Sequence, residues 1–311
     1  MKSHVVVMKG RPRETTVKAL QKLHSRAAGK ILIKPNVASH ARGNGENTDV
    51  RVVEGIVEYF QGQGELTIAE GCCGAEGSVP ASTYELFEFL GYSKLKERYD
   101  VKLLDLNDGP FEEIRLYDRD FRVSKPALDA DYLISVPTLK THQLTTISGC
   151  VKNLMGCLEP HPEPGHETAT KWEIHEELSE SDPAVDLHDC LLSLGKFEHR
   201  LIDLYKRLSP RLGVIDAYVG SEGESPIDGT PVRMGLVLAS ENPISCDAVG
   251  AYLMGIDPKV VDHLKFAKEE NLGEIDPQKI ATNVDLVRYR RNFRLPSFIE
   301  YLNKSRTSTS V

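Results

Sequence analysis

Apolar and polar positions alternate along residues 1–160 in the manner of strands followed by helices. The apolar runs rich in β-branched residues are "HVVVMK", "KILIKPNV", "ELTIAEG", "VKLLDL" and "DYLISVP". Between them lie segments whose apolar residues recur at helical spacing, such as "TTVKALQKLH" and "DVRVVEGIVEYFQ". Strands joined in succession by helices form crossover units on a parallel sheet, with helices on both faces. We therefore expect an α/β fold with a mostly parallel, doubly wound sheet.

Two segments depart from this pattern. The stretch "FEEIRLYDRDFRVSK" alternates at period two around a polar turn, which predicts a β-hairpin. Residues 158–182 are rich in proline, glycine, histidine and acidic residues and show no periodicity. A long irregular segment inside a compact domain is typically a functional loop, so we expect a lid over a site.

The second half of the chain predicts a further set of helices and strands. A helix is expected at about 183–208, then the strands "RLGVIDAYVG" and "VRMGLVLAS" around an acidic loop, then the helices "ISCDAVGAYLMG" and "PKVVDHLKFAKEENLG". The end, "NKSRTSTSV", is expected to fray. We predict one α/β domain over 1–290, with 291–311 as a C-terminal extension and tail. The alternative is two lobes, 1–157 and 183–290, bridged by the loop at 158–182.

Composition narrows the classes of partner. The 311 residues include 40% hydrophobic and 27% charged residues and carry a net charge of −8. Such a field repels nucleic acid and anionic lipid, so we expect no nucleic-acid and no membrane partner. The six cysteines form no C-x-x-C pair, and the first apolar run is too short for a signal peptide. These features predict a cytoplasmic protein with reduced thiols.

The stretch "LKTHQLTTISGCVKNLMG", residues 139–156, has the composition of a binding segment. Its apolar residues follow helical spacing and predict a helix packed on the sheet; they are Leu144, Ile147, Val151, Leu154 and Leu158. Lys140 and His142 would precede this helix, where free N–H groups favour an anion. Lys152 would add charge, while Thr145 and Asn153 would orient a phosphate or carboxylate. The alternative is helix capping and a glycine-mediated helix contact.

A second lysine-bearing stretch lies at the end of the second strand. Lys34 closes an apolar run and is followed by Pro35, Asn36 and a polar loop that runs to Thr48. Ligands of doubly wound sheets collect outside the carboxyl ends of the strands. Lys34 and Lys140 both occupy such ends, so we expect them to converge, with Asn36 as a further anion ligand. Glu70, at the end of the third strand, is another candidate.

Acidic residues and histidines supply candidates for proton transfer. Asp216 and Glu222 belong to a glycine-rich acidic loop that also holds Glu224 and Asp228; such oxygens suit a divalent metal or a general base. An acidic surface turn is the alternative. In the irregular segment, the candidates for closing over a substrate are His166, Lys171 and His175.

Several motifs in sequence order resemble the family catalogued as domain of unknown function 362. They are "KPN", "TD-x-R-VVEG", "KTH…SG-x-VKNLMG", "IDAYVGSEG-x-SP-x-DG-x-P" and "LAS-x-NP-x-x-x-DAVGAYLMG-x-DP". The likeness extends over residues 30–273. It singles out the following positions: Lys34, Asn36, Lys140, His142, Lys152, Asn153, Asp216, Glu222, Gly223 and Asp247. Family members are often joined to ferredoxin-type iron–sulfur domains. This chain lacks such a cysteine array, so it resembles the stand-alone form, without an intrinsic cluster.

Together these features predict an enzyme or binding protein for a small anionic metabolite. Lys34, Lys140 and Lys152 would hold the phosphate or carboxylate, and His142, Glu222 or Asp216 would move a proton. The reaction is not specified by the residues. The alternative, implied by the resemblance, is a redox or metallocentre accessory protein that works with a ferredoxin-type partner.

Overall fold

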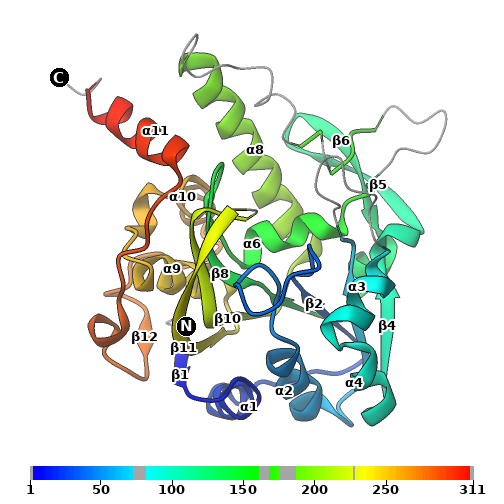
Figure 1. Cartoon of the computed structure of the whole chain (residues 1–311). Helices are drawn as coiled ribbons and strands as arrows, with labels where there is room; N and C mark the ends of the chain where they lie inside the picture. Colours follow the sequence, from blue (N-terminus) through cyan, green and yellow to red (C-terminus); the bar gives the residue numbers. More distant parts are fainter. Residues whose placement is uncertain are drawn as a thin grey trace.

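The computed structural model describes residues 3–72, 82–160, 168–171, 173–174, 187–226 and 228–308. Within these residues the chain forms a mostly parallel sheet with helices on both faces, which confirms the expected α/β fold (Figure 1). The main path of strands is β12 (Ala281–Thr282), β1 (His4–Lys9), β11 (Asp228–Ser240), β10 (Leu212–Glu224), β7 (Tyr132–Val136), β2 (Lys30–Pro35), β3 (Glu65–Glu70) and β4 (Val101–Asp105). Off this path, β8 (Thr138–His142) pairs with β10, and β9 (Thr146–Ser148) pairs with β8.

The five strands from β10 to β4 on this path are mutually parallel, whereas β11 runs antiparallel to β10 and β1. The carboxyl ends of β2, β3, β7 and β10 therefore lie at one edge of the sheet. This arrangement is the geometric basis of the site described below.

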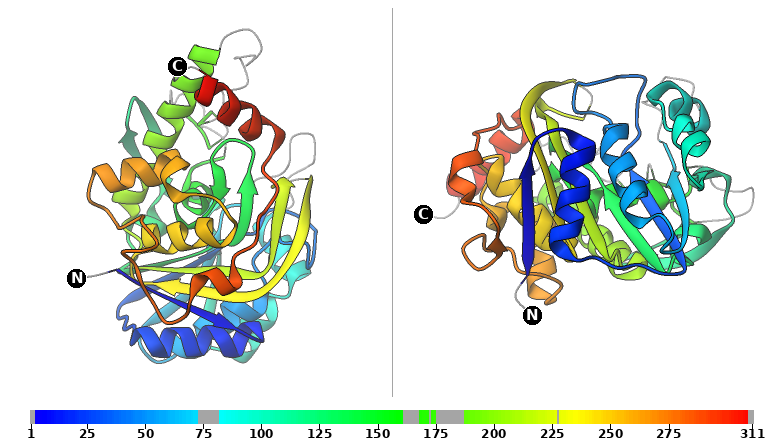
Figure 2. Two further views of the ribbon diagram at one scale, coloured as in Figure 1. Left: turned by 90° about the vertical axis from the view of Figure 1, so that its left-hand side faces the viewer. Right: turned by 90° about the horizontal axis from the view of Figure 1, so that it is seen from below.

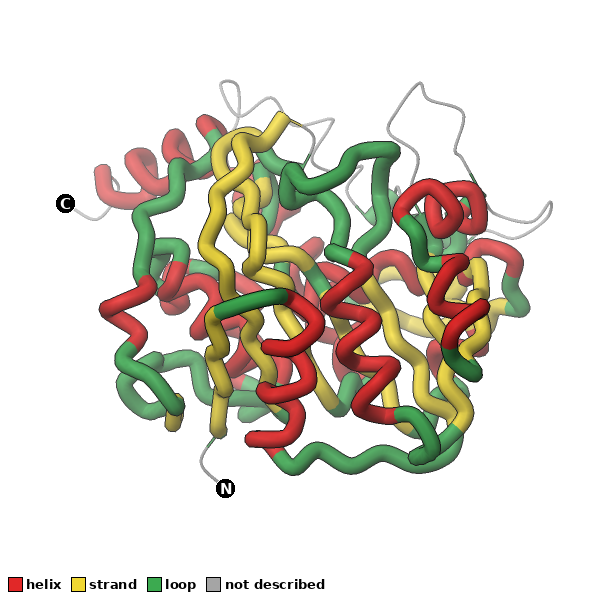
Figure 3. The backbone as a smooth tube through the Cα atoms, turned by 60° about the horizontal axis from the view of Figure 1, so that its bottom comes forward, coloured by secondary structure: helices red, strands yellow, loops and turns green. Residues whose placement is uncertain are grey.

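Helices cover the two faces in separate layers (Figures 2 and 3). One layer holds α1 (Pro12–Leu23), α2 (Val50–Phe60), α3 (Thr83–Leu90) and α4 (Ser93–Arg98). The other holds α6 (Cys150–Asn153), α8 (Leu187–Leu208), α9 (Pro243–Leu253) and α10 (Asp262–Glu269). Successive residues of β2 contribute to opposite layers: Ile31 and Ile33 pack with α2, while Leu32 packs in the α8–α9 layer. Apolar runs buried on both faces are what a central parallel strand requires.

The predicted hairpin is confirmed as β5 (Phe111–Leu116) and β6 (Arg119–Ser124), an antiparallel pair. The described part of the irregular segment lies along this hairpin, because Ala169 bridges to Phe121 and Leu158 bridges to Val123. Shorter elements complete the chain: η1 (Leu106–Asp108), α5 (Lys125–Leu128), η2 (Leu154–Cys157), η3 (Pro258–Val260) and η4 (Leu286–Tyr289).

The prediction of a helix from residue 144 to 158 is wrong for the first half of this stretch. Strands β8 and β9 form a small antiparallel hairpin in which Lys140 pairs with Ser148, and the helix begins only at Cys150. Strand β8 is also paired with β10, so its backbone hydrogen bonds belong to the sheet. The apolar spacing suggested a helix because Ile147, on a strand, and Val151, on the helix, enter the same core.

The prediction of an acidic loop after Asp216 is also wrong. Strand β10 continues to Glu224 and turns directly into β11, with Glu224 paired to Asp228. The helix α11 (Ser297–Ser308) extends into residues 303–308 of the tail that was expected to fray. Its residues Ile299 and Leu302 are buried in a small cluster with Cys190 and Leu194 of α8.

Among the described residues, no helix has both the length and the apolar character needed to cross a membrane.

Candidate functional site

A buried ion pair joins the ends of β2 and β3. The Lys34 Nζ and Glu70 Oε1 atoms are 2.7 Å apart, and the two side chains are 1% and 4% exposed. Glu70 also accepts hydrogen bonds from the backbone N–H groups of Val37 (3.2 Å) and Gly71 (3.0 Å). Burial raises the pKa of Glu70, although Lys34 and Lys171 oppose this effect. The pair therefore fixes the start of both loops that leave the carboxyl edge.

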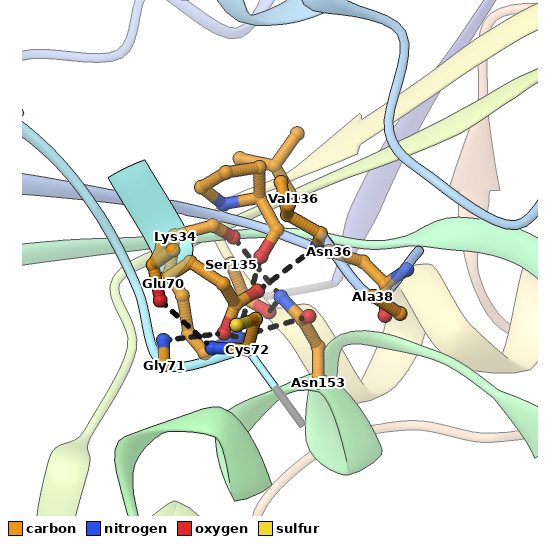
Figure 4. Close-up of polar contacts among 12 residues, drawn as sticks. Lys34, Asn36, Ala38, Glu70, Gly71, Cys72, Ser135, Val136 and Asn153 are labelled. Atoms are coloured by element: carbon orange, nitrogen blue, oxygen red, sulfur yellow. Dashed lines mark hydrogen bonds and ion pairs between the residues drawn. The ribbon is translucent and has the colours of Figure 1, made fainter. Parts of the chain in front are cut away.

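Asn153 connects this ion pair to the neighbouring strand (Figure 4). Its Oδ1 accepts a hydrogen bond from Lys34 Nζ at 3.2 Å, and its Nδ2 donates to the backbone oxygen of Lys34 and to Ser135 Oγ. Ser135 Oγ in turn donates to the backbone oxygen of Cys150. Two sites predicted separately, on β2 and on α6, are thus one hydrogen-bonded network.

Lys171 reaches the same place from the irregular segment. Its Nζ donates to Asn107 Oδ1 at 2.7 Å and to the backbone oxygen of Gly71 at 3.2 Å, and the residue is buried. Lys171 was expected in a lid, and its ammonium instead lies inside the site. The other two lid candidates, His166 and His175, lie outside the described residues.

Two glycines allow this packing. A Cβ atom at Gly156 would lie 2.1 Å from Glu70 Oε1 and 2.7 Å from Lys34 Nζ. A Cβ atom at Gly71 would lie 2.4 Å from the backbone oxygen of Gly156. A larger residue at Gly156 would displace the charged groups, and one at Gly71 would displace the Gly156 backbone, so here glycine is required by close approach.

Lys140 lies on β8 and is 3% exposed. Its Nζ donates to the backbone oxygen of Glu46 at 3.1 Å, and Asn36 Nδ2 donates to that same oxygen. Burial lowers the pKa of Lys140 to about 8, and Lys152 contributes in the same direction, while Glu46 and Glu70 oppose it. Lys34 acts on Lys140 as well, so the lysines of the two predicted stretches do influence each other electrostatically.

Lys152 is half-buried on α6, with its Nζ 5.7 Å from the centre of the Phe197 ring. The start of α6 is not open to an anion, contrary to expectation. The N–H groups of Cys150 and Val151 donate to the Asp247 carboxylate at 2.6 and 3.1 Å. The chain's own carboxylate therefore occupies the helix terminus.

His142 lies two residues after Lys140 and so on the same face of β8. Its Nδ1 accepts hydrogen bonds from the backbone N–H groups of Leu144 (3.1 Å) and Thr145 (3.3 Å). An accepting Nδ1 places the proton of the neutral ring on Nε2. Thr145 Oγ1 donates to the backbone oxygen of Ile147, so Thr145 shapes the turn between β8 and β9.

The acidic candidates serve other parts of the molecule. Asp216 is buried and accepts hydrogen bonds from the backbone N–H groups of Asp49 (2.8 Å) and Tyr218 (2.9 Å). Burial raises the pKa of Asp216 to about 7. Glu222 pairs instead with Arg294, whose Nε lies 3.0 Å from Glu222 Oε1. Because Glu222 follows Ser221, the register partner of Lys140, its side chain lies on the opposite face.

These contacts show that the prediction of a metal-binding loop at Glu222 and Glu224 is wrong. Glu222 and Glu224 hold the C-terminal segment, since Glu224 Oε1 accepts a hydrogen bond from the backbone N–H of Ser297 at 2.8 Å. Throughout the part of the chain that is described, histidine, cysteine and acidic side chains form no group of three that could hold a metal ion. The described cysteines, which are Cys72, Cys150, Cys157, Cys190 and Cys246, are buried and unpaired by disulfides.

The site holds more buried lysines than ion pairs among the described residues. Its charged groups are four lysines and three carboxylates that act on them; the lysines are Lys34, Lys140, Lys152 and Lys171, and the carboxylates are Glu46, Glu70 and Glu198. The Glu46 carboxylate is itself held by Ser39 and Asn44. A surface pocket of about 570 Å³ lies elsewhere, against α9 and β12, and none of the predicted residues lines it.

Sequence reasoning misses three contributors to this network. Ser135 is a polar residue inside an otherwise apolar strand, and this break in the apolar pattern could have identified it. Asn107 follows β4, a strand end to which no candidate was assigned. Glu46 contributes a backbone oxygen, and no side-chain pattern can indicate such a contact.

The chain is similar in sequence to a cyanobacterial protein and to a family of proteins. It is 28% identical over 247 residues to the thylakoid-associated protein sll1697 of Synechocystis sp. (strain ATCC 27184 / PCC 6803 / Kazusa), an alignment that covers 78% of this chain and 68% of that protein. A solved structure, the lactate racemase apoprotein of Thermoanaerobacterium thermosaccharolyticum, superposes with a TM-score of 0.45 and 15% identity. That superposition covers 80% of this chain, which spans only 57% of the racemase chain. The model of the family described as "Domain of unknown function (DUF362)" matches residues 31–252, and the chain belongs to this family.

Proposed function

We propose that this protein binds a small anionic metabolite at the lysine-rich carboxyl edge of its sheet and acts on it as an enzyme. The observation that carries this proposal is the charge imbalance of the site. Three of its four lysines are buried, and among the described residues only Lys34 of these three forms an ion pair. Burying charge without a partner is expensive, so a phosphate or carboxylate ligand would compensate the excess.

The residues have separate roles in this proposal. Lys140 donates to a backbone oxygen and forms no ion pair with the described carboxylates, and Lys152, half-buried on α6, acts on it electrostatically, so these are the two lysines we assign to the ligand. Lys34 is committed to Glu70 and holds the strand ends in place. His142 shares a strand face with Lys140 and is the proton-transfer group that the contacts favour over Glu222 and Asp216. The expected cytoplasmic location is part of the same proposal.

A thermal-shift titration with inorganic phosphate, phosphorylated sugars and small carboxylates tests this function. A ligand that binds only the folded state raises Tm as its concentration rises, and the gain is about 2.7 kcal/mol at a hundred times Kd. We expect K152M to weaken the effect at least tenfold. The matched control is K102M, which removes the exposed lysine of the Lys102–Glu65 pair on β4 and β3. Equal responses of K152M and the wild type would contradict the assignment.

The accessory role with a ferredoxin-type partner rests on the family resemblance, and no specific contact of the described residues favours it. Anaerobic purification followed by iron and sulfide analysis tests it directly. Stoichiometric iron and sulfide would support that role.

A further inference from the structure

The buried lysines of the proposed site differ in the partners that compensate their charge. This step rests on the proposed function. Lys34 forms an ion pair with Glu70, and Lys171 is held by the Asn107 amide and by the backbone oxygen of Gly71. Lys140 donates to a backbone oxygen, and no carboxylate oxygen of the described residues lies within 4.0 Å of its nitrogen. Lys140 is thus the buried amine whose charge is least compensated.

Its surroundings favour the neutral amine. Burial and the positive charge of Lys152 lower the pKa of Lys140 to about 8. At pH 7 about one tenth of such amines are neutral, compared with about one in 2,500 for a lysine of ordinary pKa. Desolvation and a neighbouring cation are the means by which proteins make a lysine nucleophilic at neutral pH.

Unsatisfied hydroxyl groups lie on the same face of the sheet as Lys140. Thr138 precedes it by two residues on β8, and Ser221 is its register partner on β10. Both hydroxyls are fully buried and have no hydrogen-bond partner among the described residues. Buried polar groups are nearly always paired, so two orphans on the same sheet face as Lys140 point to a polar ligand that completes them.

We propose that Lys140 forms a Schiff base with a small anion that carries an aldehyde or ketone group. The neutral Nζ adds to the carbonyl carbon, and the carbonyl oxygen takes up a proton to give a carbinolamine. The hydroxyl group then leaves as water after a second protonation, and the nitrogen loses its protons to give the imine. One water is released, and no oxidant or reductant is consumed. His142 supplies and recovers the protons, while Lys152 holds the phosphate or carboxylate.

The segment 36–49 contacts the Lys140 ammonium. The backbone oxygen of Glu46 accepts a hydrogen bond from the Lys140 ammonium and another from the side-chain amide of Asn36. Gly43 and Gly45 have φ values of 70° and 83°, a conformation that favours glycine. A ligand that replaces the Glu46 oxygen must displace this part of the segment.

Reductive trapping tests the inference. The full chain is incubated with sodium cyanoborohydride and one of two probe sets: glyoxylate and pyruvate, or glyceraldehyde 3-phosphate and pyridoxal 5′-phosphate. Intact mass and peptide mapping should show one saturable adduct at Lys140, at least tenfold above Lys102. The set that labels at the lower concentration identifies the charge type. The trapping rate should rise with an apparent pKa of about 8.

The variant K140R keeps the positive charge and should lose the adduct. Adducts spread over surface lysines, or equal labelling of K140R, would overturn the Schiff-base assignment. If phosphate or carboxylates still raise Tm in that case, the binding function stands and only the nucleophile is wrong. If no anion raises Tm or competes with labelling, the binding function fails as well.

Discussion

Lys34 and Glu70 form a 2.7 Å ion pair at the carboxyl ends of two adjacent parallel strands, with both side chains almost completely buried. Each partner also holds other groups: Lys34 contacts Asn153, and Glu70 accepts the N–H groups of Val37 and Gly71. The pair therefore organises three segments that are distant in sequence. Removing the pair should therefore disturb the positions of all three segments.

Removing one partner of this pair should destabilise the protein strongly. Both K34M and E70Q are expected to lower the free energy of unfolding by about 3–5 kcal/mol, since each leaves a buried group uncompensated. The double variant K34M/E70M should recover part of that loss. Chemical denaturation measures all three. E65Q, which breaks the exposed Lys102–Glu65 pair, is the control and should leave the free energy of unfolding nearly unchanged, because solvent screens this pair. Equal losses in the buried and exposed pairs would contradict this account.

Adding a methyl group at Gly156 should disrupt the same pair. In G156A the new Cβ would approach Glu70 Oε1 to 2.1 Å, so charged groups must shift, and we expect a loss of about 2 kcal/mol or more. The matched control is G195A on α8, where a Cβ meets nothing within 4 Å. That change should stabilise the helix by about 0.5–1 kcal/mol. Thermal melts that shift in the same direction for both variants would rule out the close-approach argument.

Stability should fall between about pH 4 and pH 7 because of Asp216. The folded-state pKa is raised to about 7 by burial, so the folded protein binds a proton that the unfolded chain has already released. The stability that this proton provides is present at low pH and is lost as pH rises through 7. D216N should remove about 2–3 kcal/mol of the change between pH 5 and 8. Urea titrations at both pH values measure it, with the exposed D100N as control. An unchanged pH dependence in D216N would contradict the raised pKa.

Lys140 should contribute a change of the opposite sign at high pH. Its folded-state pKa is lowered to about 8, so between pH 8 and 10.5 the unfolded chain binds more protons and stability rises with pH. At pH 7 the buried ammonium destabilises the fold, and K140M is expected to raise the free energy of unfolding by about 1–3 kcal/mol. The difference from wild type should disappear near pH 10.5. The comparison with K102M separates this effect from a general loss of charge. A destabilised K140M at pH 7 would show that Lys140 is compensated by a partner.

Much of the fold could be predicted from periodicity. Apolar runs such as residues 31–33 are buried on both faces because helices cover both sides of a parallel sheet, and this pattern is local and strong. The hairpin of β5 and β6 was recognisable because its alternation and its turn lie within fourteen residues. Lys34 could be placed at a strand end for the same reason.

The sequence by itself therefore determined the alternation of elements and the placing of lysines at strand ends, since both depend on neighbours in the chain. The tertiary structure decided the rest. Residues 138–148 became a hairpin because β10 offered backbone partners, and Glu222 was directed to Arg294 because the C-terminal segment returns to β10. Lys140 acquired its neighbours Lys152 and Glu46 only through folding. Burial and charge compensation depend on residues that are remote in sequence, and no local pattern records them.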